Sequence, residues 1–273
     1  MMIDKRTAMR IGIGGGVAMK LALLALLACT ARAHAADAVA VADSADVPAL
    51  LKAADRYRTS ADDMQVETVV STLGNDGQVD KVRRYTVFAQ SGHKSLVLMK
   101  SPAEAGQKVL MLGDDFWLLM PSSQRPLRIT PTQKLLGDAS TGDIATMSWS
   151  EDYAGQVLGE EQCEADGATR PCLHLQLHST RPGVSYQRIE LWLGKARHEP
   201  LKAELYVQSD KLAKLATFVF DKPAAPTQVQ EMVLQDRLAS HRVTRVQYLS
   251  KVAKSVPPSW LNPMFLVRNP MLE

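Results

Sequence analysis

Two cysteines, Cys163 and Cys172, carry the clearest chemistry in this 273-residue chain. They flank eight residues, Glu164–Pro171, that are rich in turn formers and therefore indicate a hairpin loop. In an oxidising compartment, two cysteines that bracket a hairpin predict a disulfide, with two free thiols as the alternative. A catalytic thiol is disfavoured because the sequence shows no base that could be paired with it.

The other residues that could do chemistry fit no known site. Asp138 and Asp143 lie five apart in a Gly-rich segment, but the spacing matches no EF-hand loop, so we interpret them as turn and helix-cap residues. His174 and His178 are four apart on a predicted strand, about 13 Å along it, too far to share one metal ion. We interpret both as surface histidines.

Catalytic motifs are missing from the sequence. It contains no G-x-S-x-G elbow, no H-E-x-x-H pair and no phosphate-binding glycine loop. The chain is therefore expected to be neither an enzyme nor a cofactor or metal protein. A hydrolase with an unrecognised site is kept as a minor alternative.

The N-terminus has the layout of a secretory signal peptide over residues 1–35. Basic residues precede the apolar run Leu21–Ala28, and Ala33–Ala35 forms an A-x-A cleavage site. The run is too short to span a bilayer, which needs about 20 apolar residues. We expect cleavage after Ala35 and a periplasmic protein. In the alternative, Leu26–Cys29 is a lipobox and Cys29 is lipidated.

Removal of this leader changes the charge of the chain. The leader holds five of the 32 Lys and Arg residues and one of the 29 Asp and Glu residues, so the formal net charge falls from +3 to near −1. Nucleic-acid binding needs a concentrated basic face and is excluded as a function class.

The remaining chain is expected to form one domain. Residues 36–46 are small and acidic and predict a flexible tail, and residues 47–273 predict a single domain, a common size for one all-β fold. The stretch Val47–Tyr57 predicts an amphipathic helix with Leu50, Leu51, Ala54 and Tyr57 near one face.

Thirteen short strands follow, separated by turn signals, which predicts an antiparallel sandwich or barrel. The predicted strands are Met64–Leu73, Val79–Gln90, His93–Lys100, Lys108–Leu112, Phe116–Met120, Leu127–Thr130, Tyr153–Glu161, Cys172–Ser179, Ser185–Leu193, Leu201–Gln208, Leu215–Asp221, Val229–Leu238 and Arg242–Val252.

Two of these strands are apolar on both faces. The strand that ends at Leu193 alternates normally, with one apolar face. Strands 108–112 and 116–120 do not, so both of their faces must be covered, either by a bound ligand on one side or by ordinary core on both. The sequence does not show which of the two alternating sets of side chains on these strands points inward. The candidate groove residues are Val109, Met111, Trp117, Leu119, Leu191 and Leu193.

An ordered set of motifs resembles the LolA-like family of outer-membrane lipoprotein-sorting proteins. The set comprises the strand Phe116–Pro121, the Gly-Asp-rich segment Gly137–Asp143, Trp149, and a C-terminal stretch, Pro257–Phe265, that looks like the family's closing segment. The resemblance covers residues 47–265.

The resemblance implies a mainly β fold of the α+β type. It would be a strongly curved antiparallel sheet that forms an incomplete barrel with a helical lid. The implied function is that of a periplasmic, monomeric carrier that binds the acyl chains of lipoproteins or other lipids in a hydrophobic groove. The implied partner is an inner-membrane transporter of the ABC or RND type, or an outer-membrane acceptor. An envelope-stress sensor on the same fold is the alternative.

Overall fold

The computed structural model describes residues 46–59, 62–123, 125–130, 143, 148–165, 167–238 and 240–268. Residues 41–273 form one compact unit, and the fold below is that of its described part. The predicted signal peptide, nearly all of the predicted tail, and residues 137–142 of the Gly-Asp-rich segment lie outside the described residues. No helix in the described ranges is both long and apolar enough to cross a bilayer.

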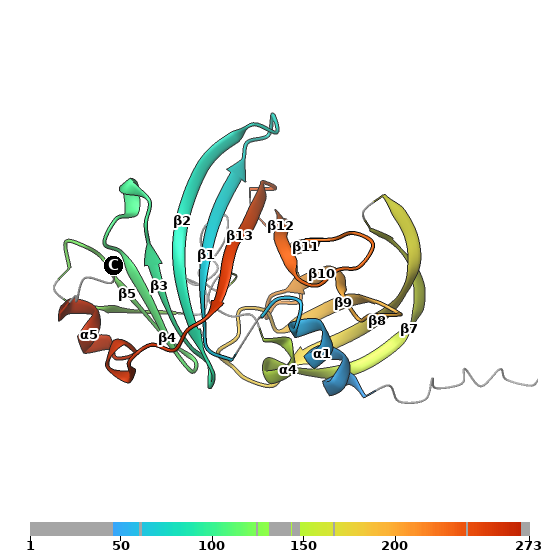
Figure 1. The fold of residues 1–273 in the computed structure, drawn as a ribbon, viewed down its shortest axis with the longest axis horizontal. Coiled ribbons are helices and arrows are strands. Elements are labelled where there is room, and N and C mark those ends of the chain that lie inside the picture. Colours follow the sequence, from blue (N-terminus) through green and yellow to red (C-terminus); the bar gives the residue numbers. More distant parts are fainter. Residues whose placement is uncertain are drawn as a thin grey trace, which may run out of the picture. The chain divides into compact units, whose positions relative to one another are not determined.

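One antiparallel sheet of thirteen strands dominates the unit (Figure 1). The first six strands are β1 (Met64–Leu73), β2 (Val79–Gln90), β3 (Lys94–Met99), β4 (Lys108–Leu112), β5 (Asp115–Leu119) and β6 (Leu127–Ile129). The other seven are β7 (Tyr153–Ala165), β8 (Ala168–Ser179), β9 (Arg188–Gly194), β10 (Pro200–Tyr206), β11 (Leu212–Phe220), β12 (Val229–Asp236) and β13 (Val243–Ala253).

The sheet consists of two meanders joined at its centre. Strands β1–β6 and strands β7–β13 each pair with their sequence neighbours, and β1 pairs with β13, for example Val70 with Val246. The strand order ends at β6 and β7, which share no pairing among the residues described here. The sheet is therefore not closed, and the predicted mainly β, incomplete-barrel fold is confirmed.

All thirteen predicted strands are present, but some ends differ. The third strand begins at Lys94 because His93 adopts a left-handed conformation, with φ of 56°, in the preceding turn. The predicted loop between the cysteines is mostly strand, since the hairpin turns only between Ala165 and Ala168.

The structure joins Cys163 of β7 to Cys172 of β8 in a disulfide, with the two Cα atoms 5.9 Å apart. The sequence prediction of this pairing is borne out, although the bridge ties two strands rather than the ends of a loop.

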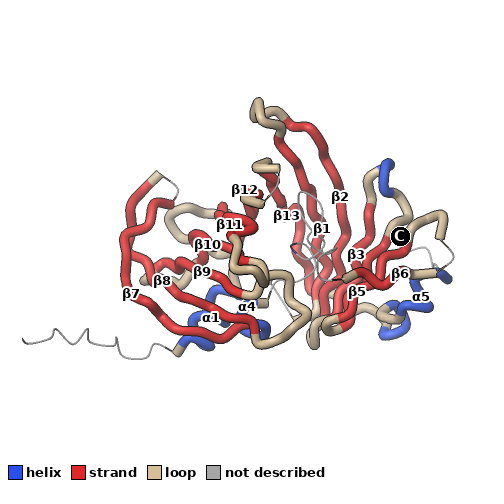
Figure 2. The backbone as a smooth tube through the Cα atoms, turned by 180° about the vertical axis from the view of Figure 1, so that it is seen from behind, coloured by secondary structure: helices blue, strands red, loops and turns tan. Residues whose placement is uncertain are grey.

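A helix, α1 (Val47–Asp55), packs on one face of the sheet (Figure 2). It begins at Asp46, whose carboxylate accepts a hydrogen bond from the Ala49 amide at 3.3 Å, an N-cap. Its buried side includes Leu50, Leu51 and Ala54, as the amphipathic pattern predicts. These side chains join a large group of buried residues from both meanders, which we call the inner cluster.

The opposite face of β2–β5 is covered by the C-terminal segment. This segment contains the short 3-10 helix η2 (Pro258–Trp260) and α5 (Pro263–Arg268), neither of which was predicted as a helix. Phe88 of β2 and Trp260 meet edge to face, with ring centroids 5.7 Å apart. The Lys108 ammonium donates to the Leu266 carbonyl at 3.4 Å. We call this second core the outer cluster; it also contains Leu96, Leu98, Leu110, Leu119 and Val256.

Two more short helices complete the described elements. The 3-10 helix η1 (Pro102–Glu104) connects β3 to β4, and α4 (Trp149–Asp152) precedes β7. Helix α4 contacts α1 directly, and Trp149 lies in the inner cluster edge to face with Phe218, at 5.8 Å between centroids.

Candidate functional site

A cavity of about 660 Å³ lies between α1, α4 and the face of the sheet that carries the inner cluster. We call it the α1 cavity. Its volume is within the range of about 300–1,000 Å³ that is usual for ligand pockets. Its apolar lining comes mainly from β1, β2, β4 and β13 and includes Met64, Val66, Val87, Met111, Val246 and Tyr248.

Charged residues surround this apolar lining. The basic residues are Lys52, Arg56, Arg58, His93, Lys94 and Lys251, and the acidic ones are Asp55, Asp62, Glu151 and Asp152. A cavity with apolar walls and charged groups at its edge can hold a molecule that has both an apolar part and a polar part.

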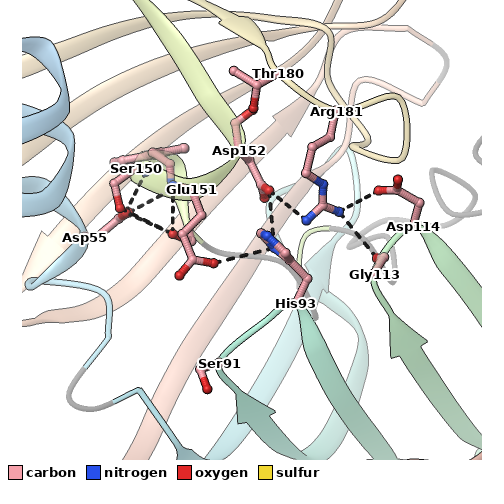
Figure 3. Close-up of polar contacts among 12 residues, drawn as sticks. Asp55, Ser91, His93, Gly113, Asp114, Ser150, Glu151, Asp152, Thr180 and Arg181 are labelled. Atoms are coloured by element: carbon pink, nitrogen blue, oxygen red, sulfur yellow. Dashed lines mark hydrogen bonds and ion pairs between the residues drawn. The ribbon is translucent and has the colours of Figure 1, made fainter.

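Asp55 ties α1 to α4 (Figure 3). Its carboxylate accepts hydrogen bonds from the Trp149 amide at 3.0 Å and from the Ser150 amide at 2.8 Å. These amides belong to the first two residues of α4 and have no hydrogen-bond acceptor within the helix, so Asp55 supplies one. Asp55 is only 6% exposed, and the link holds the two helices together at the cavity edge.

Arg58 shares this arrangement. Its guanidinium forms an ion pair with Asp55 at 3.4 Å and lies over the Trp149 ring at 3.7 Å from the centroid. Burial lowers the pKa of Arg58, and Asp55 opposes that shift. The guanidinium stays charged, because even a substantial shift leaves arginine far above neutral pH.

A second ionic group connects α4 to three loops (Figure 3). The Asp152 carboxylate lies 3.4 Å from His93 Nδ1 and 3.1 Å from Arg181 Nη1, and Arg181 also contacts Asp114 at 2.7 Å. Burial raises the pKa of Asp152, while Arg181 and His93 act in the opposite direction. The group thus joins the β2–β3, β4–β5 and β8–β9 turns across the two meanders.

Four of the six predicted groove residues lie on the cavity side of the sheet. Val109 and Met111 on β4, and Leu191 and Leu193 on β9, all belong to the inner cluster. Among these four, Met111 lines the α1 cavity itself. The groove role of this set stays a prediction.

The remaining two residues lie on the other face. Leu119 belongs to the outer cluster, and Trp117 packs against it, under the C-terminal segment. The structure therefore does not bring the six residues together. It shows that strands β4 and β5 are apolar on both faces because the inner cluster covers one face and η2 and α5 cover the other. Met111 is therefore part of the candidate site, and Trp117 is not.

His174 and His178 face different surroundings. His178 is exposed, as expected, whereas His174 bridges Glu161 at 2.8 Å and Glu190 at 3.0 Å. The His174 ring also stacks on Trp192, with centroids 4.2 Å apart. No group of His, Cys, Asp and Glu side chains in the described ranges is arranged to hold a metal ion.

Asp143 has a role that the sequence did not predict. Its carboxylate forms a buried ion pair with Lys214 of β11 and accepts the Tyr186 hydroxyl at 2.5 Å. It therefore anchors its segment to the interior rather than serving only as a turn or cap residue. Asp138 lies outside the described residues.

Sequence reasoning missed Asp55, Arg58 and Lys251 as cavity residues. A signal existed for Asp55, which follows Leu51 by four residues and so shares the buried face of α1. No comparable signal existed for Lys251. The pairing of β1 with β13 contains a β-bulge near Thr68, and this bulge reverses which side chains at the end of β13 face the cavity.

Comparison with known sequences gives one family match. A family model whose description reads "Uncharacterized protein" matches residues 91–268. No protein with a curated description matches the chain significantly.

Several solved structures resemble the fold of this chain. A LolA superfamily protein from Nitrosomonas europaea is 30% identical, with a TM-score of 0.69, covering 81% of this chain and 98% of that one. A DUF1329 family protein from Desulfovibrio piger is 22% identical, with a TM-score of 0.62 and coverages of 79% and 97%. A putative outer membrane lipoprotein-sorting protein domain from Vibrio parahaemolyticus is 19% identical, with a TM-score of 0.61 and coverages of 80% and 98%. The last two show the fold alone.

Proposed function

This chain belongs to the LolA superfamily, and from that premise we propose that it carries the acyl chain of a lipoprotein or another lipid in the α1 cavity. The observation that carries the proposal is the cavity itself, about 660 Å³ between a helix and an apolar sheet face. The name of the Vibrio neighbour, an outer membrane lipoprotein-sorting domain, supports the same class of ligand.

The binding energy in this proposal comes from burial of apolar surface. Each methylene group that leaves water contributes roughly 0.8 kcal/mol, so ten methylenes contribute about 8 kcal/mol before the cost of ordering the chain. No covalent chemistry is needed. Release requires a membrane partner that binds the lipid more tightly or displaces α1, and we propose a transporter or an outer-membrane acceptor in this role.

The carrier is proposed to act in the periplasm. The leader pattern over residues 1–35 and the Cys163–Cys172 disulfide support an oxidising compartment outside the cytoplasm. The expected mature N-terminus is Ala36, and intact-mass analysis of the exported protein measures it. A mass that fits an acylated Cys29 at the N-terminus would instead show a membrane-anchored protein.

A substitution that fills the cavity tests the carrier function. Val66 of β1 lines the α1 cavity and is 6% exposed, so Val66→Trp should occupy space that a lipid needs. The matched control is Val252→Trp on the adjacent strand β13, where the side chain is 49% exposed.

The assay is a fluorescence titration with an acyl probe, beside a thermal melt. The proposal expects Val66→Trp to weaken acyl binding at least tenfold while Val252→Trp binds like the unmodified protein. Unchanged binding by a folded Val66→Trp protein would place the lipid elsewhere, and absence of any acyl binding by the unmodified protein would refute the carrier function.

A further inference from the structure

The positive charges at the α1 cavity exceed the negative charges available to neutralise them. Within the described residues, Lys52, Arg56, Lys94 and Lys251 have no carboxylate at ion-pair distance. By contrast, three of the four lining carboxylates already have partners: the α4 amides and Arg58 engage Asp55, Arg181 engages Asp152, and the His93 ring contacts Glu151. Only Asp62 has none among the residues described.

Lys251 is the most deeply placed of these four cations. Its ammonium donates to the Val229 carbonyl at 2.9 Å and lies 4.6 Å from the centre of the Tyr248 ring. An ammonium has three N–H donors, and the described part of the chain supplies an acceptor for one of them. The other two donors have no hydrogen-bond acceptor among the described residues.

The surroundings of Lys251 penalise its charge. Burial, with a further contribution from the positive charge of Arg58, lowers the pKa of Lys251 to about 8. The side chain is thus charged at neutral pH but incompletely compensated. An anion placed beside it would be stabilised by the same low polarity that now disfavours the isolated charge.

Lys251 also lies directly beside apolar lining. In the β1–β13 register it is paired with Val66, and both line the cavity. The point where a charged group would bind and the surface where a hydrocarbon chain would pack are consequently adjacent. A free small anion would leave this apolar surface exposed, and a neutral hydrocarbon would leave two of the three ammonium N–H donors without an acceptor from the ligand.

We propose that the α1 cavity selects an acyl lipid with an anionic head group, and that Lys251 binds this head group while the chain packs on Val66 and Met111. The proposal rests on the carrier function above and specifies its ligand class. The exposed cations Lys52, Arg56 and Lys94 attract the same head group to the cavity edge.

The test compares one lipid with and without its charge. The probes are cis-parinaric acid, a fluorescent fatty acid that is ionised at pH 7, and its neutral methyl ester. The unmodified protein should bind the acid about tenfold more tightly than the ester, the factor that corresponds to about 1.4 kcal/mol. This preference should decrease as the pH rises above about 8, where Lys251 loses its proton.

Lys251→Met keeps the aliphatic stem and removes the charge. It should abolish the preference for the acid while leaving ester binding and the melting temperature nearly unchanged. The matched control is Lys254→Met, three residues further along, whose ammonium contacts Gln65 and the Phe88 ring of the outer cluster. This control should keep the full preference.

The possible outcomes separate the two proposals. Equal affinity for acid and ester, or a preference that survives Lys251→Met, overturns the head-group proposal and leaves the carrier function standing. Binding of neither probe overturns both. Displacement of the acid by inorganic phosphate at similar concentration would indicate a simple anion site, and it also overturns the proposal.

Discussion

Adjacent residues on β4 allow a direct comparison of the two faces of the sheet. Leu110 and Met111 are consecutive, so their side chains point to opposite sides. Met111 lines the α1 cavity and is 4% exposed, whereas Leu110 is 0% exposed within the outer cluster. We predict that replacing each with glutamate produces different defects.

The expected magnitudes follow from these environments. Leu110→Glu loses the transfer free energy of a buried leucine, about 2–3 kcal/mol, and buries a carboxyl group without a partner, about 1–3 kcal/mol more. The sum, about 3–6 kcal/mol, is comparable with the whole stability of a small domain. Met111→Glu places its carboxylate beside a cavity large enough for water, so we expect a loss of about 1–2 kcal/mol.

Denaturant unfolding measures the stability of each variant, and titration with the methyl ester of cis-parinaric acid measures acyl binding without charge repulsion. Met111→Glu should remain folded and bind the ester at least a hundredfold more weakly. The reason is that the acyl chain of the ester, on entering the cavity, must remove water from the new carboxylate. Leu110→Glu should be largely unfolded. Equal destabilisation of both variants would show that the inner face is sealed core. Normal binding by a folded Met111→Glu protein would show that the acyl chain binds elsewhere.

Two further predictions concern stability. Asp55→Ala should lower the free energy of unfolding by about 3–5 kcal/mol, because it leaves the buried Arg58 without its carboxylate partner. The control Asp46→Ala, at the exposed N-cap of α1, should lower it by about 1 kcal/mol. Similar losses for the two variants in chemical unfolding would contradict the link between Asp55 and Arg58. Replacing both Cys163 and Cys172 with serine should lower it by up to about 3 kcal/mol, and peptide mapping that finds both thiols free to alkylate would remove the bridge.

Residue patterning predicted the strands and an antiparallel β fold, and the resemblance to the LolA-like family selected the incomplete barrel. Alternating apolar residues and turn formers defined all thirteen strands, and strands β1 and β2 have the predicted ends. The loop of the β7–β8 hairpin is shorter than predicted because the turn former Pro171 is accommodated within β8. Propensity describes a local preference, and pairing with neighbouring strands overrides it.

The side of the sheet on which each residue lies could not be derived completely. Simple alternation from Val246 and Tyr248 would place Val252 on the cavity side and Lys251 outside. The β-bulge at Leu249 reverses this assignment, so that Lys251 faces the cavity. A bulge depends on the partner strand and leaves little trace in a single sequence.

The distinction between groove and core also depends on distant segments. Leu110 and Met111 are equivalent in hydrophobicity, and they differ because the C-terminal segment, more than 140 residues later, covers one face of β4. In the same way, the link from Asp55 to α4 joins residues separated by 94 positions. Contacts of this kind follow from the assembled sheet and not from local spacing.

Mass spectrometry of the protein purified from periplasm without detergent tests the central claim most directly. The unmodified protein is expected to carry a lipid in near-stoichiometric amount, identifiable after extraction as an acyl compound with an anionic head group, and Val66→Trp is expected to lose it. Native protein without enriched lipid, or an equal lipid content in the folded Val66→Trp variant, would contradict the assignment of the α1 cavity as the site of an acyl carrier.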